Sequence, residues 1–264
     1  MRTLKTLRYV LVVVALATAA CSKTSTSTDT GVPSAPSPTF SGDVKGSLVS
    51  LRTSFSYDPN KFINPKPPIA LPVVDVDAET AVAAFSNDFS TAVYLDAGAV
   101  SVNTKSLDKL SNNTYTKLAF DYTSPTLDLG FGSGSNWSVA GNGDVPAISY
   151  NHTTTFPNYS GKADLPETVS SSSDLTITLT GKISSSDSVY VLLANNSKQI
   201  LKRVGGGASS VTISASDIAT LGTTGGNATA ILEVCPWNFT IETISSKKYA
   251  FVKEQAVVKY VKIN

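Results

Sequence analysis

The chain has 264 residues, and its 21 basic side chains nearly balance its 20 acidic ones. Without a basic patch or a long run of Lys and Arg, the sequence gives no indication of nucleic-acid binding. One histidine and two cysteines are too few for an ordinary zinc site and leave little material for nucleophilic catalysis. We therefore expect a protein that is not an enzyme and that carries no cofactor.

The first twenty residues have the parts of an export signal. Three basic residues fall among the first eight, and an uncharged stretch rich in Val, Leu and Ala follows. This stretch is shorter than the roughly 20 apolar residues that a helix needs to cross a bilayer. Residues 1–20 are therefore predicted to be a secretory signal peptide.

The end of the signal, Ala19-Ala20-Cys21, resembles the lipobox of bacterial lipoproteins, although Thr18 stands where the lipobox favours Leu. The resemblance implies cleavage before Cys21 and attachment of lipid to this residue. The protein would then be anchored in the cell envelope, at the periplasmic or surface face of an outer membrane. A plain secretory signal that ends beside a cysteine is the alternative.

Residues 21–40 are rich in Ser, Thr and Pro and nearly free of apolar side chains. Such a segment buries too little surface to offset the entropy of ordering, so we expect a flexible tether behind the lipid anchor. Without the signal, 18 basic residues stand against 20 acidic ones. Cys235 is the only cysteine left beside Cys21, and a disulfide within the folded part is excluded.

Residues 41–162 are predicted to form an N-terminal β-rich domain. Val44–Phe55 has the composition of a strand. The segment "AETAVAAFSND" that starts at Ala78 allows a helix or a strand. We favour the strand, because the following "STAVYLDAGAVSVN" can pair with it as the next arm. At its end, "SGKADLPETVSSSS" has the composition of a linker.

Residues 163–264 are predicted to form a second β-rich domain. About seven short alternating strands in about a hundred residues are typical of an immunoglobulin-like sandwich. One helical turn is expected in "SASDIATLG", with Ser216 as its N-cap and Gly222 as its end. The whole chain is thus expected to be all-β, with one or two antiparallel β-sandwich domains, the C-terminal one immunoglobulin-like.

Three segments, "VYLDAGAVSVN", "LTITLTGKISSSDSVYVLLAN" and "KKYAFVKEQAVVKYV", resemble those of cell-envelope lipoproteins of Bacteroidota-type bacteria. The resemblance covers most of the chain after the signal and rests on the texture of strands and turns. It supports the cell-envelope location and brings no catalytic or binding residues with it.

The single histidine, His152, would have to serve any Ser-His-Asp or Cys-His system. The sequence contains no Gly-x-Ser-x-Gly elbow, and we expect His152 to be a solvent-facing imidazole among threonines. Cys235 lies in the apolar "ILEVCPW", where a buried, inert thiol is the usual state.

Three acids alternate in "VDVDAE". The period of two places Asp75, Asp77 and Glu79 on one face of a strand, where a Ca²⁺ ion would relieve their mutual repulsion. A solvated strand face is the simpler interpretation, and the twelve-residue calcium loop is not matched.

Aromatic rings gather among Asn, Gly, Ser and Thr in residues 136–160. Trp137, Tyr150 and Tyr159 are the candidates for stacking on a glycan or peptide. The alternative is that these rings are core residues of alternating strands.

Two hypotheses follow for the function, and an enzyme is a distant third because the usual catalytic groups are scarce. The first is a non-catalytic binding module, held at the membrane through lipid on Cys21, that recognises a glycan or an envelope protein. The second is a structural or assembly lipoprotein whose aromatic rings are all buried. Exposure of Trp137 separates the two.

Overall fold

The structure is a computed structural model that describes residues 43–57, 69, 73–118, 126–195, 197–224 and 230–264. Cys21, the signal and the tether lie outside these ranges. Strands make up most of the described chain, and the prediction of an all-β protein is confirmed. Across those ranges, the structure contains no helix with the length and apolar character to cross a membrane.

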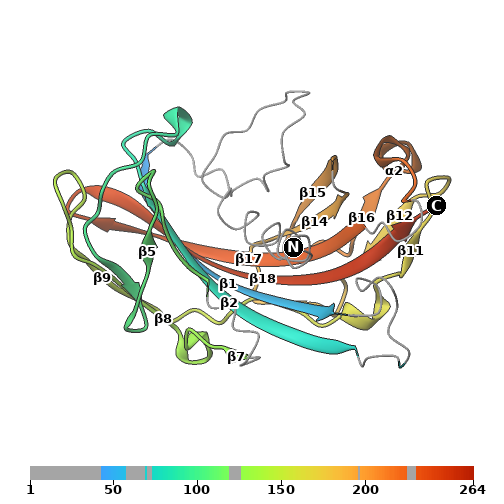
Figure 1. Cartoon of the computed structure of the whole chain (residues 1–264), viewed down its shortest axis with the longest axis horizontal. Coiled ribbons are helices and arrows are strands. Elements are labelled where there is room, and N and C mark those ends of the chain that lie inside the picture. The colour runs from blue at the N-terminus through green and yellow to red at the C-terminus, as the bar shows by residue number, and fades with distance from the viewer. Residues whose placement is uncertain (1–42, 58–68, 70–72, 119–125, 196, 225–229) are drawn as a thin grey trace.

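A ten-stranded sheet forms the body of the molecule (Figure 1). Its strands are β1 (Val44–Tyr57), β2 (Val74–Phe85), β5 (Asp108–Lys109), β6 (Tyr115–Leu118), β7 (Thr126–Leu127), β11 (Thr168–Val169), β14 (Ser188–Ala194), β15 (Gln199–Gly205), β17 (Ala230–Ile244) and β18 (Lys247–Ile263). The order is β15-β14-β17-β18-β1-β2-β6-β5, with β11 beside β18 and β7 beside β2. The four longest strands, β17, β18, β1 and β2, run across the whole molecule as one curved layer.

The first and last long strands, β1 and β18, lie side by side in the middle of this sheet. They pair in parallel, whereas β1–β2 and β17–β18 are antiparallel. Strand pairing therefore crosses the boundary expected after residue 162 and joins the two predicted regions through one sheet. The immunoglobulin-like arrangement of residues 163–264 stays a prediction.

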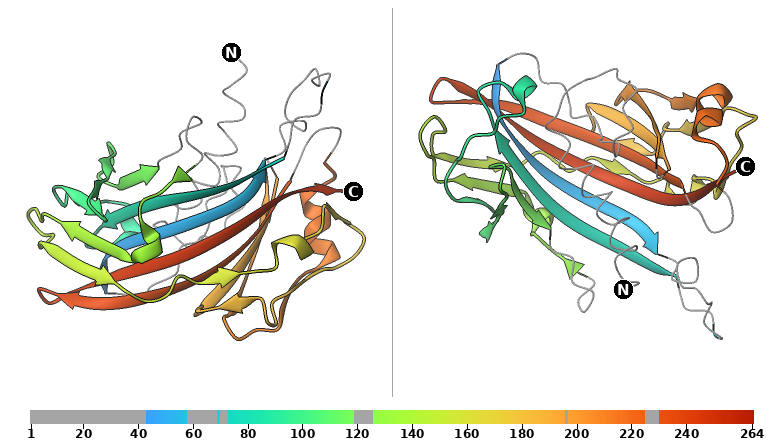
Figure 2. Two further views of the ribbon diagram at one scale, coloured as in Figure 1. Left: turned by 90° about the horizontal axis from the view of Figure 1, so that it is seen from below. Right: turned by 45° about the horizontal axis from the view of Figure 1, so that its top comes forward.

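Three small sheets lie at the two ends of the long strands (Figure 2). The four-stranded one has the order β4-β3-β8-β9, and the two-stranded ones are β10-β13 and β12-β16. Their bounds are β3 Val100–Val102, β4 Lys105–Ser106, β8 Ser135–Val139, β9 Ile148–His152, β10 Asn158–Tyr159, β12 Leu175–Thr178, β13 Ile183–Ser184 and β16 Ser210–Ile213. The short helices are η3 (Phe89–Thr91), η4 (Phe131–Ser133), η5 (Lys162–Asp164) and α2 (Ala215–Leu221).

Alternating side chains divide the long sheet into two faces. On one face, an apolar cluster at one end packs the long strands against β3, β8 and β9, and a second cluster at the other end packs them against β10, β12, β16 and α2. The opposite face carries a third cluster, which includes Val49, Trp237 and Val252.

Several local predictions can be compared with the structure. "AETAVAAF" is a strand, as expected, and forms most of β2. The predicted helical turn is α2, which ends at Gly222 as expected. Its N-cap is Ser214 rather than Ser216, because the Ser214 hydroxyl accepts a hydrogen bond from the backbone N–H of Asp217. The segment expected to be a linker is instead packed, since Leu165 and Val169 are both 2% exposed within the second cluster.

Candidate functional site

A polar band crosses the face of the long sheet between the two apolar clusters. Arg52 on β1 is in register with Gln255 on β18 and with Glu79 on β2, so these three side chains form one cross-strand row. Lys253 and Asp77 extend the band along β18 and β2 on the same face, because both are two residues away from a member of the row. The small sheets cover the ends of this face.

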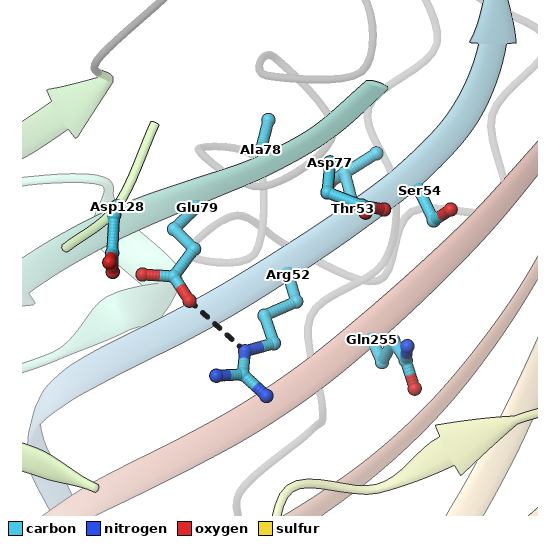
Figure 3. Close-up of a pocket in the computed structure, with 8 residues that line it drawn as sticks. All are labelled: Arg52, Thr53, Ser54, Asp77, Ala78, Glu79, Asp128 and Gln255. Carbon is cyan, nitrogen blue, oxygen red and sulfur yellow. Dashed lines mark hydrogen bonds and ion pairs between the residues drawn. The ribbon is translucent and has the colours of Figure 1, made fainter. Parts of the chain in front are cut away.

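Two hollows meet over the polar band and share Arg52 and Gln255. One, of about 350 Å³, lies over β1 and β2 and is drawn in Figure 3. The other, of about 420 Å³, lies between η4 and the segment Thr153–Asn158. Because they share residues, we treat the two hollows as one groove, the polar groove.

The acidic part of the polar groove is organised by Glu79. Its carboxylate accepts from the Arg52 Nε at 3.1 Å, the pair drawn in Figure 3. The second carboxylate oxygen accepts the backbone N–H groups of Leu129 and Phe131 at 2.7 and 3.2 Å. Glu79 therefore fixes both the guanidinium and the turn that forms the groove's wall. Asp77 and Asp128 add two exposed carboxylates to this part.

The opposite wall is held by a buried lysine. Lys253 is 1% exposed, and its ammonium donates to the carbonyl oxygens of His152 and Thr154 at 2.7 and 2.5 Å. These carbonyls belong to the segment that leaves β9 and crosses the sheet towards β10. Burial, followed by the nearby Arg52 guanidinium, lowers the pKa of Lys253 to about 8.

Both cations of the groove lie against one aromatic ring. The Arg52 guanidinium carbon is 4.4 Å and the Lys253 Nζ 4.9 Å from the centroid of the Phe156 ring, distances typical of cation–π contacts. Phe131 stacks on the same ring with a centroid distance of 5.6 Å. Phe156 is thus occupied by its own neighbours and serves as a support for the two cations.

His152 is fully buried, so the prediction of a solvent-facing imidazole was wrong. Its Nε2 lies 2.8 Å from the Thr154 hydroxyl and 3.5 Å from that of Thr240, so the expected threonine neighbours are present. Burial, followed by the charge of Lys253, lowers the pKa of His152 to about 4, and the ring is neutral at ordinary pH. Through its contact with Thr154, the ring helps to hold in place the segment that leads from β9 to β10.

Two of the three predicted ligand-binding rings are buried in the core, and the third is half-buried. Trp137 is 1% and Tyr159 3% exposed, and they belong to the two different apolar clusters. Tyr150 is half-buried, lies 4.0 Å from the Phe251 ring centre and donates to Glu242. The three rings lie on three different strands, β8, β9 and β10, and pack against other parts of the protein. They therefore do not present a common stacking platform.

The three acids predicted for Ca²⁺ do share one face of β2. Asp75 binds Lys162 at 2.9 Å, and the Ser56 hydroxyl and Lys162 lower the pKa of its carboxyl. Glu79 is paired with Arg52, whereas Asp77 lines the groove. In the described ranges no three His, Cys, Asp or Glu side chains are grouped to hold a metal ion. We therefore make no calcium proposal.

Cys235 is a buried free thiol, as expected, and burial raises its pKa well above the usual range. It belongs to the cluster on the face of the long sheet opposite His152. A Cys-His pair is therefore not formed.

Sequence reasoning missed Arg52, Lys253 and Gln255. The signal that could have found two of them is "YAFVKEQAVV", where three polar residues interrupt an apolar run in the longest strand. Their connection with position 52 depends on the parallel pairing of β1 with β18. No protein-family model, curated protein or solved structure matches this chain.

Proposed function

We propose that this protein is a non-catalytic binding module of the cell envelope, anchored through lipid on Cys21, and that its polar groove binds a glycan. The observation that carries the proposal is the groove itself, a hollow over charged and amide side chains in the middle of a sheet whose ends are packed. Keeping polar groups at this position without water or a partner would cost free energy. The same groups can orient a polar ligand.

The lining favours a ligand rich in hydroxyl groups. Thr153, Thr154 and Thr155 are all exposed along one wall, and carboxylates and an amide face them from the sheet. Hydroxyl and amide groups both donate and accept hydrogen bonds, and carboxylates accept them, so the lining can satisfy sugar hydroxyls. The occupied ring of Phe156 makes polar recognition, rather than stacking, the main source of affinity.

The absence of catalysis is part of the same proposal. His152 is buried and bound to Thr154, and Cys235 lies on the other face of the sheet. Neither is placed to activate a nucleophile in the groove.

A structural or assembly role is the second candidate, and the burial of Trp137 and Tyr159 favours it. Under that alternative the groove would hold only water or a segment of a partner protein. A ligand titration separates the two.

Filling the groove tests the proposal. A side chain at Gly132 would extend beside Arg52, since a Cβ built there lies 3.8 Å from the guanidinium and meets nothing closer. We expect Gly132→Leu to weaken glycan binding by about tenfold, through exclusion of the ligand and not through unfolding. The measurement is a heteronuclear NMR titration of the full chain in detergent micelles with a panel of neutral and acidic oligosaccharides.

Gly207→Leu is the matched control, because a Cβ there meets nothing within 4 Å and Gly207 lies outside the groove. Saturable shifts in the groove that Gly132→Leu removes and Gly207→Leu preserves would support glycan binding. If no oligosaccharide shifts groove resonances, or if both variants bind like the parent, the glycan proposal fails and the structural role takes its place.

The lipid anchor has a separate test. Cys21→Ser is expected to move the protein from the membrane fraction to the soluble fraction of cells, because the acylated residue is lost. Fractionation with mass analysis of the N-terminus checks this. Equal membrane association of parent and variant would contradict the anchor.

A further inference from the structure

Two cations of the polar groove, Arg52 and Lys253, lie against the same Phe156 ring. The Arg52 Nε donates to Glu79, so this ion pair does not use the two terminal NH₂ groups, and Arg52 lines both hollows of the groove. One of the NH₂ groups is close to Gly132 at the groove's wall. Within the described chain, the terminal NH₂ groups form no further ion pair.

Lys253 presents the second cation. Its ammonium has three protons, and two of them are taken by the carbonyls of His152 and Thr154. Among the described residues it has no carboxylate partner, although its side chain is almost completely buried. A buried ammonium that is held only by carbonyl oxygens is poorly neutralised, and an anion close by would stabilise it.

Gln255 is the third polar side chain of this part of the groove. The Oε1 atom of Gln255 is buried and accepts no hydrogen bond in the described structure. Gln255 stands beside Arg52 in the cross-strand row and lines both hollows. A ligand hydroxyl at this point could donate to it.

From this arrangement we infer that the polar groove contains an oxyanion subsite between Arg52 and Lys253, which takes the carboxylate of an acidic sugar. This inference rests on the proposed glycan function and names the class of glycan. The Arg52 NH₂ groups and the remaining Lys253 proton would make charge-assisted hydrogen bonds to the carboxylate oxygens. Burial is the main cause of the lowered pKa of Lys253, and the charge of Arg52 is the second. The repulsion between the two cations is relieved when the anion binds.

The acidic part of the groove limits the rest of the ligand. Asp77 and Asp128 are exposed carboxylates in the adjoining hollow, so a second anionic group there would be repelled. Carboxylates accept readily from hydroxyl groups. The ligand that fits is therefore one uronic acid next to a neutral sugar, not a continuous polyuronate.

A matched pair of disaccharides tests the subsite. Cellobiouronic acid differs from cellobiose by a carboxylate in place of one hydroxymethyl group. We expect the acid to bind the full chain about ten- to a hundredfold more tightly, as hydrogen bonds between charged partners would give. The readout is NMR titration of the Lys253 ammonium and the Arg52 Nε resonances, with inorganic phosphate as a third titrant.

The variant Arg52→Gln is expected to reduce the preference for the acid to about threefold or less, because it removes the cation and keeps a polar side chain. Arg203→Gln is the matched control, since Arg203 also contacts a ring, that of Trp237, but does not line the groove. Its preference for the acid should equal that of the parent.

The outcomes separate the two proposals. Preference for the acid that depends on Arg52 supports the subsite. Equal binding of both disaccharides overturns the subsite and leaves glycan binding standing. If neither disaccharide binds but phosphate shifts the Lys253 resonance, the oxyanion subsite is supported for a free anion and the glycan function fails. No response to any titrant overturns both.

Discussion

Replacing Trp137 with alanine is expected to lower the free energy of unfolding by about 3–5 kcal/mol. The indole is 1% exposed in the cluster between the long sheet and β3, β8 and β9, where it pairs across strands with Val102 and Tyr150. Its removal leaves a cavity that the surrounding strands cannot fill. Urea denaturation of parent and variant, followed by far-UV circular dichroism, measures the loss.

Two controls define this result. Ser138→Ala changes the next residue of β8, which is exposed, and is expected to stay within about 0.5 kcal/mol of the parent. Trp137→Phe should lose less than the alanine variant, since the indole Nε1 has no hydrogen-bond partner to forfeit in the described structure. A Trp137→Ala protein as stable as the parent would show that the ring is not a core residue. Trp137 would then again be a candidate for contact with a ligand.

Raising the pH from 6.5 to 8 is expected to destabilise the protein by about 2 kcal/mol, or about 4–8 °C in Tm. The cause is a pair of buried acids on the face opposite the groove, Glu233 and Glu254, each 3% exposed. Burial, with a further contribution from Glu254, raises the pKa of Glu233 to about 8, and burial raises that of Glu254 to about 7.

The sign follows from proton binding. The ordinary pKa of both groups is 4.5, so at pH 6.5 the unfolded chain has lost protons that the folded chain still holds. Their contribution is fully present below pH 4.5 and disappears as the pH rises through 7 and 8. Lys253, with its lowered pKa, opposes the trend by only about 0.4 kcal/mol in this interval. His152 opposes the trend by about the same amount, because at pH 6.5 half of the unfolded imidazole is still protonated while the folded ring is neutral.

Glu233→Gln tests the assignment, because glutamine imitates the protonated acid. We expect the variant to lose more than half of the pH dependence and to be more stable than the parent at pH 8. Thermal unfolding at several pH values between 6.5 and 8 supplies the comparison, and Glu167→Gln, at an exposed position, is the control. If the parent's Tm does not change across this interval, the two carboxyl groups are not buried as described.

Alternation along the chain was enough to predict the class of fold and some side-chain faces. It placed Asp75, Asp77 and Glu79 on one face of a strand, and they lie there in β2. The buried Cys235 was indicated separately, by the apolar run "ILEVCPW" around it. The class of fold and the strand faces depend on a period of two residues within one strand, which any strand reveals regardless of its partners.

The candidate site could not be predicted, because its members come from distant parts of the sequence. Arg52, Glu79 and Gln255 meet only through the order and register of three strands. The same limit explains why the burial of Trp137 was not predicted. Alternation assigns a side chain to one face of its strand, but it does not show whether other elements cover that face. His152 lies under the same limit: its polar neighbours suggested solvent, but a crossing segment and β17 enclose it.

The neighbourhood of β1 and β18 has a consequence for how the chain acquires its structure. Val49 pairs with Val252, roughly 200 residues later, so the centre of the sheet is closed only by the last part of the polypeptide. Such a topology has a high contact order, which slows folding. An N-terminal half emerging from a ribosome or a translocation channel cannot complete its own core, and the fold forms after the whole chain has been delivered. The connectivity of the sheet thus suppresses premature folding, which would suit the export that the proposed lipid anchor requires.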